Sequence, residues 1–128
     1  MSTATTFAYN EGLKPGSGKH YFVYCPDYTD SEALSRRMAV RPEHLASWQP
    51  LNENGWTKLS GPFFTPESIE PGATDKKFVG SMFIIEAESV EAIRKRIEAD
   101  AYWKGNVWDK EKFSITAWGG PTTMWPRA

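Results

Sequence analysis

His44 is the residue whose type and spacing point most directly to chemistry. A partly buried imidazole exchanges its proton near neutral pH and can act as a general acid or base. On a helix that begins near Arg41, positions 41, 44, 48 and 51 share one side, which places His44 in line with Trp48 and Leu51 on the inward face. Two interpretations stay open: a core histidine whose nitrogens are both hydrogen-bonded, and a catalytic acid or base.

Asp100 is the second candidate, since it follows an amphipathic stretch and precedes Ala101, where a short turn begins. Such an aspartate commonly caps the free backbone N–H groups at the start of a turn or helix. It can also accept a hydrogen bond from an imidazole, select the tautomer and stabilise the charged form, as in a His–Asp dyad. The sequence alone leaves both roles open.

Basic residues occur in two short clusters. Arg36, Arg37 and Arg41 precede His44, and such clusters are usually solvated surface. The alternative is that Arg41 binds an anionic group of a substrate. The run Arg94-Lys95-Arg96 is predicted to be the outer face of a helix.

The chain has six tryptophans, a high density for 128 residues. Most are expected in the core, with some available to line a cavity for a flat organic ligand. The single cysteine, Cys25, ends an apolar run next to Pro26 and is predicted to be a small buried residue rather than a nucleophile.

Other classes of site lack a signal in the sequence. It contains no glycine-rich phosphate loop, no paired metal-ligand spacing and no nucleophile elbow, so we expect no cofactor and no metal. The net charge of −1 and the pI of about 6.1 argue against nucleic-acid binding. No apolar stretch is long enough for a membrane helix, and no secretory signal is recognisable, so a cytoplasmic protein is expected.

The order of predicted elements indicates an α+β domain. Pro42 is expected to end one helix and start a second one that runs to Glu53. Strands are predicted at 20–25, 56–64, 77–87 and 107–118, and helices at about 29–38, 41–53 and 89–99, followed by a turn or short helix at 100–105. This is the ferredoxin-like βαββαβ arrangement, with helices on one face of the sheet only. The open face predicts a homodimer that packs sheet against sheet.

The domain is predicted to span residues 19–118. Residues 1–18 are predicted to be an N-terminal extension, because they contain a small polar stretch and the flexible joint Pro15-Gly16-Ser17-Gly18. Residues 119–128 are predicted to be a C-terminal tail that cannot be helical.

Several short segments resemble the YCII-related proteins. The matching segments are Tyr21–Tyr24, Leu34–Met38, Val40–Leu45, Gly61-Pro62, Gly80-Ser81, Ala99–Tyr102 and Gly105–Trp108. The resemblance implies a dimeric α+β barrel, with relatives that include muconolactone isomerase-like enzymes and a dehydrochlorinase acting on a chlorinated hydroxyquinol. It also implies a His–Asp pair at a pocket, which maps onto His44 and Asp100. Ala101 stands where the family has proline, and Trp108 where it has tyrosine, which implies a less rigid turn and a different pocket wall.

These inferences lead to one functional hypothesis and an alternative. We expect a small cofactor-independent acid–base enzyme, of dehydratase, dehydrohalogenase, isomerase or cyclase type, that acts on a cyclic or aromatic small molecule, with a natural-product tailoring step as its setting. His44 and Asp100 would be catalytic, while Arg41, Trp48, Tyr102 and Trp108 would contact the substrate. The alternative is a non-catalytic binder of small molecules or a partner of another enzyme. A third option is an interaction module in which His44 and Asp100 only satisfy each other in the core.

Overall fold

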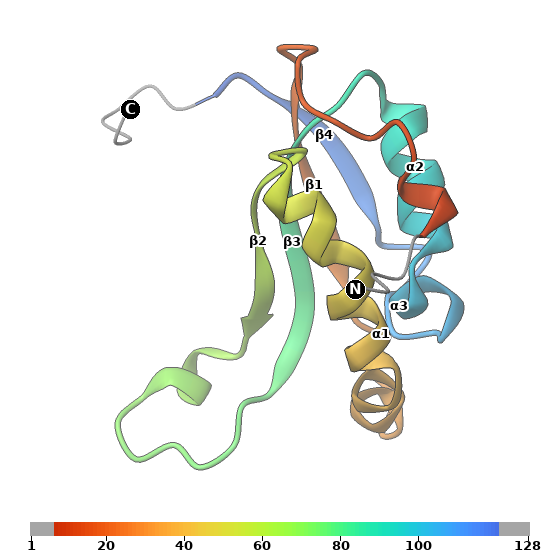
Figure 1. The fold of residues 1–128 in the computed structure, drawn as a ribbon. Helices are drawn as coiled ribbons and strands as arrows, with labels where there is room; N and C mark the ends of the chain where they lie inside the picture. The colour runs from red at the N-terminus through yellow and green to blue at the C-terminus, as the bar shows by residue number, and fades with distance from the viewer. Residues whose placement is uncertain (1–6, 121–128) are drawn as a thin grey trace, which may run out of the picture.

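A four-stranded antiparallel sheet forms the centre of the molecule in the computed structural model, which describes residues 7–120 (Figure 1). The strands are β1 (His20–Pro26), β2 (Thr57–Phe64), β3 (Phe78–Glu86) and β4 (Ser114–Trp118), in the order β2-β3-β1-β4. The helices are α1 (Ala33–Glu53), α2 (Val90–Ala99) and the short α3 (Ala101–Lys104). The predicted α+β class with ferredoxin-like topology is confirmed.

The strands alternate between a covered and an open face. Val23 on β1 pairs with Phe83 on β3, and both are buried in the core together with Trp48 of α1 and Ile93 of α2. Phe22 belongs to the opposite face, because neighbouring residues of a strand point to opposite sides. The helices therefore cover one face of the sheet, as expected.

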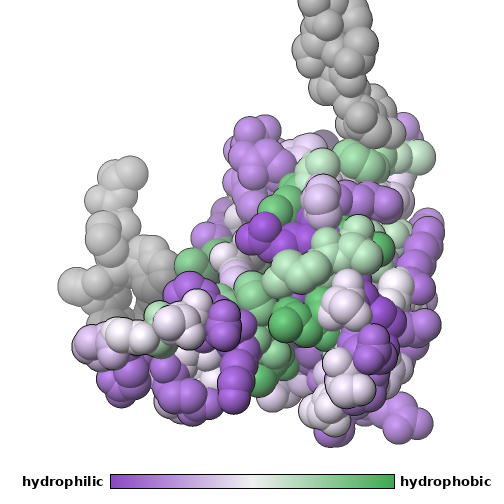
Figure 2. Space-filling view, turned by 90° about the horizontal axis from the view of Figure 1, so that it is seen from below, coloured by the Kyte–Doolittle hydropathy of each residue, from purple (hydrophilic) through white to green (hydrophobic). Residues whose placement is uncertain are grey.

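Apolar residues also reach the surface at one end of the molecule. Seen from below, they gather in the middle of the face, and hydrophilic residues surround them (Figure 2). No helix within residues 7–120 combines the length and the apolar character that a membrane crossing needs.

Pro42 does not divide the helix, so the prediction of two helices is wrong. α1 is assigned as one element with Pro42 and Pro50 inside it. An internal proline removes one backbone hydrogen bond and bends the helix, but residues on either side can keep it helical when they pack against the core. In Figure 1 the first turns of α1 are seen nearly end-on and the later turns from the side, so the direction changes along the helix.

The last strand is shorter than predicted. β4 begins at Ser114, and Trp108 makes only an isolated bridge with Asp27. The Asp109 carbonyl accepts hydrogen bonds from the backbone of Lys112 and Phe113, which forms a turn between that bridge and β4. Alternating apolar residues alone do not reveal such a turn.

Residues 7–18, the N-terminal segment, pack along the domain. The carboxylate of Glu86 accepts hydrogen bonds from the backbone N–H of Gly16 and Gly18, at 2.8 and 3.0 Å. Gly16 and Gly18 have φ values of 128° and 74°, a region that favours glycine. These N–H groups, with Lys58, lower the pKa of Glu86 to about 2, so its carboxylate is charged at neutral pH. Residues 1–6 and 121–128, which include most of the predicted tail, lie outside the described residues.

Candidate functional site

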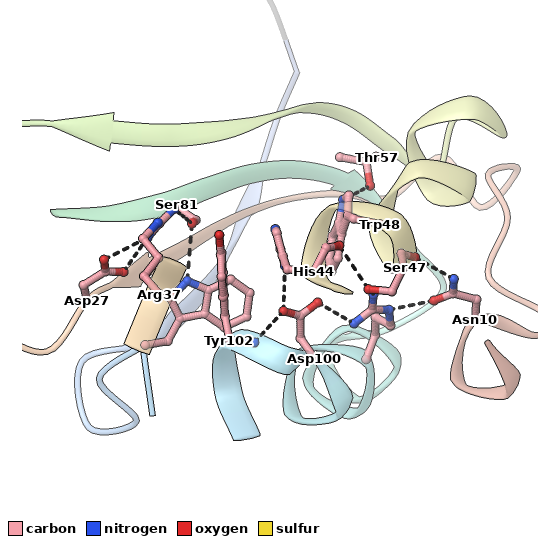
Figure 3. A network of polar contacts seen from close by, with 12 residues as sticks. Asn10, Asp27, Arg37, His44, Ser47, Trp48, Thr57, Ser81, Asp100 and Tyr102 are labelled. Atoms are coloured by element: carbon pink, nitrogen blue, oxygen red, sulfur yellow. Dashed lines mark hydrogen bonds and ion pairs between the residues drawn. The ribbon is translucent and has the colours of Figure 1, made fainter. Parts of the chain in front are cut away.

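His44 and Asp100 point toward each other in a network of polar contacts (Figure 3). Nδ1 of His44 lies 2.7 Å from Oδ2 of Asp100. His44 is 7% exposed and Asp100 is fully buried. The pair is formed because α3, which follows Asp100, packs against α1, which carries His44. The two candidate residues are therefore brought together as the dyad hypothesis requires.

Asp100 is both a helix cap and the partner of the histidine. Its Oδ2 also accepts a hydrogen bond from the backbone N–H of Tyr102 at 2.9 Å, and its Oδ1 accepts one from Nη1 of Arg96 at 3.0 Å. Burial by itself raises the pKa of Asp100, but the hydrogen bond and charge of His44, the charge of Arg96 and the Tyr102 N–H together hold that pKa below its usual value. Asp100 is therefore a carboxylate at neutral pH.

The ring of His44 is held by stacking as well as by Asp100. It lies parallel to the ring of Tyr102, with centroids 3.9 Å apart, and meets the edge of Trp108 at 5.8 Å. A carboxylate at Nδ1 selects the tautomer with hydrogen on Nδ1, so Nε2 carries the lone pair. No hydrogen bond joins Nε2 to another residue between 7 and 120. His44 is therefore an oriented imidazole whose Nε2 has no hydrogen-bond partner among these residues.

A cavity of about 360 Å³ adjoins this histidine, between α1 and the strands β2 and β3. That volume lies within the range of small-molecule sites and suits a compound with one ring. Its apolar lining includes Trp48, Phe78, Phe83 and Tyr102, and its polar lining includes His44, Arg37, Arg41 and Ser81. Aromatic walls with a few polar groups are typical of sites for flat organic ligands.

The other predicted site residues divide into two groups. Arg41, Trp48 and Tyr102 line the cavity, and Arg41 is exposed while the other two are buried. Trp108, which was predicted to contact the substrate, does not line the cavity. Its side chain is fully buried, and its indole N–H donates to the hydroxyl of Ser81 at 3.3 Å. Cys25 is fully buried, and burial, followed by the negative charges of Asp100 and Asp27, raises the pKa of its thiol well above the usual value. Cys25 is thus a small buried residue, as predicted.

Arg96 is the first residue that sequence reasoning misplaced. The run 94–96 was expected on the outer face of its helix, but Arg96 is 1% exposed. Arg96 lies three positions after Ile93, which is buried on the inward side of α2, and four positions before Asp100. Residues at these spacings lie on the same side of a helix, so Arg96 faces inward and reaches the carboxylate of Asp100. That spacing was the available signal.

Arg37 is the second such residue, since its cluster was expected to be mostly solvated. Arg37 is 2% exposed, and its Nη1 contacts both oxygens of Asp27 at 2.9 and 2.8 Å. It precedes His44 by seven positions, which places both on one face of α1. Burial raises the pKa of Asp27, while the charge and hydrogen bond of Arg37 act in the opposite direction.

The described part of the chain contains no group of three His, Cys, Asp or Glu side chains close enough to hold a metal ion. The ionisable groups that the structure brings to the cavity or next to it include the imidazole of His44, the buried carboxylate of Asp100 and the guanidinium groups of Arg37 and Arg41.

Comparisons with known proteins identify a matching family model and several relatives. The YCII-related domain matches residues 20–118. Protein YciI of Escherichia coli O6:H1 is 39% identical over 89 residues, which cover 70% of this chain and 87% of that protein. Fusaric acid biosynthesis protein 2 of Gibberella fujikuroi is 32% identical over 97 residues, which cover 76% of this chain and 89% of that protein. Among solved structures, 5-chloro-2-hydroxyhydroquinone dehydrochlorinase of Burkholderia phenoliruptrix, in complex with 2,5-dihydroxybenzoquinone, shares the fold with a TM-score of 0.64 and 24% identity, over 80% of this chain and 95% of that one.

Proposed function

The chain belongs to the YCII-related domain family, and on that premise we propose that it is a small acid–base enzyme, independent of cofactors, that acts on a cyclic or aromatic small molecule. The observation that carries the proposal is the orientation of His44. Its Nδ1 is tied to a buried carboxylate at 2.7 Å, while the ring lines a cavity of about 360 Å³. A histidine that served only the core would have both nitrogens paired and no space beside it.

His44 would transfer the proton. Nε2 removes a proton from a carbon next to a carbonyl, or from a phenolic hydroxyl, and the imidazole becomes positively charged. Asp100 stabilises that charge without taking the proton itself. Elimination follows when the electron pair of the C–H bond expels a halide or hydroxide from the neighbouring carbon, and isomerisation follows when His44 returns the proton to a different carbon. Arg41 lines the same cavity and is available to hold an oxygen of the substrate.

The relatives support the choice of substrate class. One is named for fusaric acid biosynthesis, and the structural relative is a dehydrochlorinase complexed with a dihydroxybenzoquinone. A single ring with oxygen substituents suits the aromatic walls and the polar groups of the cavity. We therefore place the reaction in a small-molecule tailoring step, with dehydration, dehydrohalogenation, isomerisation or cyclisation as the reaction types.

The test uses chlorinated hydroquinones, hydroxylated phenols and cyclic ketones, incubated with the protein in D₂O and followed by mass spectrometry. We expect loss of HCl or water, or deuterium uptake at carbon, for at least one compound. His44→Ala should lower that rate by about 100- to 10,000-fold.

The matched control is His20→Ala, which removes the other histidine of the chain, on β1 and outside the cavity. It should leave the rate unchanged. Full turnover by His44→Ala would contradict the proposal, and saturable binding of the compounds without any turnover would favour a non-catalytic binding protein.

We also propose that the protein is a homodimer that buries the open face of the sheet. That face carries a shallow depression of about 410 Å³ whose lining includes Phe22, Leu59, Met82 and Trp118. Exposed apolar surface of this kind is usually covered by a partner. Light scattering during gel filtration should give twice the mass of one chain, and Leu59→Arg should shift the protein toward the monomer. A monomeric unmodified protein at micromolar concentration would contradict the proposal.

A further inference from the structure

Arg37 has an unpaired donor in a buried position. Its guanidinium lies between the rings of Phe78 and Tyr102, at 4.6 Å from each centroid. Nη1 is bound by Asp27 and Nη2 by Ser81. Nε has no hydrogen-bond partner, and no other buried side-chain nitrogen or oxygen of residues 7–120 shares that state. Because an unpaired buried donor is unfavourable, it calls for an acceptor that the folded chain does not supply.

The free donor belongs to a side chain that lines the cavity. In a planar guanidinium, Nε–H and one N–H of Nη2 point the same way along a shared edge. Nη2 donates to the hydroxyl of Ser81 at 3.1 Å, and both Ser81 and Arg37 line the cavity. An oxygen atom of a ligand that lies on this edge, next to Ser81, would be placed to accept the Nε–H of Arg37.

The hydroxyl of Tyr102 is a second free donor beside the first. Its ring stacks on that of His44 and faces the guanidinium of Arg37. Among residues 7–120, none forms a hydrogen bond with this hydroxyl. Burial raises the pKa of Tyr102, although the charges of Arg37 and Arg41 act against that, so the hydroxyl keeps its proton at neutral pH. In Figure 3 the hydroxyl of Tyr102, the guanidinium of Arg37 and the ring of His44 all point toward the strands of the sheet.

We propose that Arg37 Nε–H and the Tyr102 hydroxyl together bind one acceptor oxygen of the ligand, a phenolate, enolate or quinone carbonyl oxygen, beside His44. This rests on the proposed function and deepens it. When Nε2 of His44 removes a proton from carbon, negative charge moves onto such an oxygen, and preoriented donors stabilise it. The buried Arg37 suits this role better than the exposed Arg41, because water screens an exposed charge. Asp27 and Ser81 would be positioning residues that hold the guanidinium.

The experiment measures equilibrium binding of two probes by calorimetry. One is 4-nitrophenol, at a pH at which it is ionised in water, and the other is nitrobenzene, which has the same ring without the hydroxyl. Tyr102→Phe removes one donor and keeps the ring that stacks on His44. We expect it to weaken binding of 4-nitrophenol by about tenfold, the range for one hydrogen bond to a charged group, and to leave nitrobenzene within about twofold.

Arg37→Lys is the second variant, since it keeps a cation for Asp27 but has no Nε–H donor. It should also weaken binding of 4-nitrophenol by about tenfold or more. The matched control is Tyr28→Phe, because the hydroxyl of Tyr28 lies outside the cavity and contacts the backbone of Lys110. It should bind both probes as the unmodified protein does.

Three results would overturn the proposal: unmodified protein that binds 4-nitrophenol no better than nitrobenzene, unchanged affinity for 4-nitrophenol in both variants, or equal weakening of both probes, which would indicate a packing defect. Neither probe reacts, so the outcome is independent of turnover. Failure of the proposed function, seen as full turnover by His44→Ala, is therefore distinguishable from failure of this binding site.

Discussion

Arg96 and Arg37 are both buried arginines held between two aromatic rings, but they differ in one nitrogen. Arg96 lies between Tyr9 and Trp48, at 4.7 and 4.4 Å, as Arg37 lies between Phe78 and Tyr102. All three nitrogens of Arg96 are paired, Nε with Asn10, Nη1 with Asp100 and Nη2 with Ser47. Arg37 leaves Nε without a partner. The folded chain therefore supplies a hydrogen-bond partner for every side-chain nitrogen of Arg96, but not for Nε of Arg37.

The carboxylates that face these arginines differ in the same sense. Asp100 has several donors, so its pKa is lowered although burial acts to raise it. The pKa of Asp27 is raised by burial, and the charge and hydrogen bond of Arg37 offset that rise only in part. Burial of an ion pair therefore does not by itself define its role. Arg96, whose nitrogens are all hydrogen-bonded, holds Asp100 and through it His44. Arg37 lines the cavity and keeps one N–H without a partner, which the proposed binding site uses for a ligand.

The largest expected effect is that of removing either arginine. Arg96→Met leaves Asp100 without its cation and should lower the free energy of unfolding by about 3–5 kcal/mol, measured by urea denaturation. Arg37→Met should lower it by roughly 1 kcal/mol less, because that residue already carries an unpaired N–H.

The control for this prediction is the double variant Asp27→Asn/Arg37→Met, which removes both charges of the pair and should recover part of the loss. If Arg37→Met lowered the free energy of unfolding more than Arg96→Met, the result would contradict the distinction between the fully hydrogen-bonded Arg96 and the partly hydrogen-bonded Arg37.

A smaller effect is expected for Asn10→Ala, which removes the acceptor of Arg96 Nε at 2.7 Å. Leaving that buried N–H unpaired should lower the free energy of unfolding by about 1–3 kcal/mol. Since Arg96 would then hold Asp100 less firmly, the Nδ1 proton of His44 should exchange faster with solvent, as measured by NMR.

Asn54→Ala is the matched control, because Asn54 contacts the same N-terminal segment through the carbonyl of Leu13 and does not touch Arg96. It should leave the exchange of the His44 proton as it is. Equal acceleration in both variants would mean that docking of the segment matters and the Asn10–Arg96 contact does not.

The smallest effect is a difference in pH dependence between the two carboxylates. The pKa of Asp27 is raised in the folded state, so its ionisation costs stability, and this cost is relieved as the pH falls through that raised pKa. The pKa of Asp100 is lowered, so its stabilisation is present above the ordinary aspartate range and is lost as the pH falls through the folded value. Carboxyl carbon NMR should show Asp27 taking up its proton at a higher pH than Asp100. The reverse order would remove this part of the comparison.

The sequence was sufficient for the topology and for choosing His44 and Asp100 as candidates, for identifiable reasons. Apolar periodicity and caps such as Ser89, whose hydroxyl accepts from the backbone of Ala92, are local signals and place the elements along the chain. His44 and Asp100 were found because histidine is rare here and aspartate stood at a predicted cap. Their contact, at 2.7 Å, became visible only with the packing of α3 on α1.

The two arginines were missed because their burial depends on tertiary partners. Arginine is rarely buried unless it is paired, and several of the partners are remote in sequence: Ser81 for Arg37, and Asn10 and Ser47 for Arg96. Pro42 misled for a related reason, since its local preference was overridden by the packing of the helix on either side.

The N-terminal segment gives the site a form of modularity. Asn10 and Tyr9 precede the family match, which begins at residue 20, yet they contact Arg96, which binds Asp100 of the His44–Asp100 pair. Substitutions in the N-terminal segment would therefore change how tightly Arg96 holds Asp100, while residues 20–118 stay the same. For protein engineering, a version trimmed to residues 20–118 would keep the His44–Asp100 pair and lose the contacts that Asn10 and Tyr9 make with Arg96.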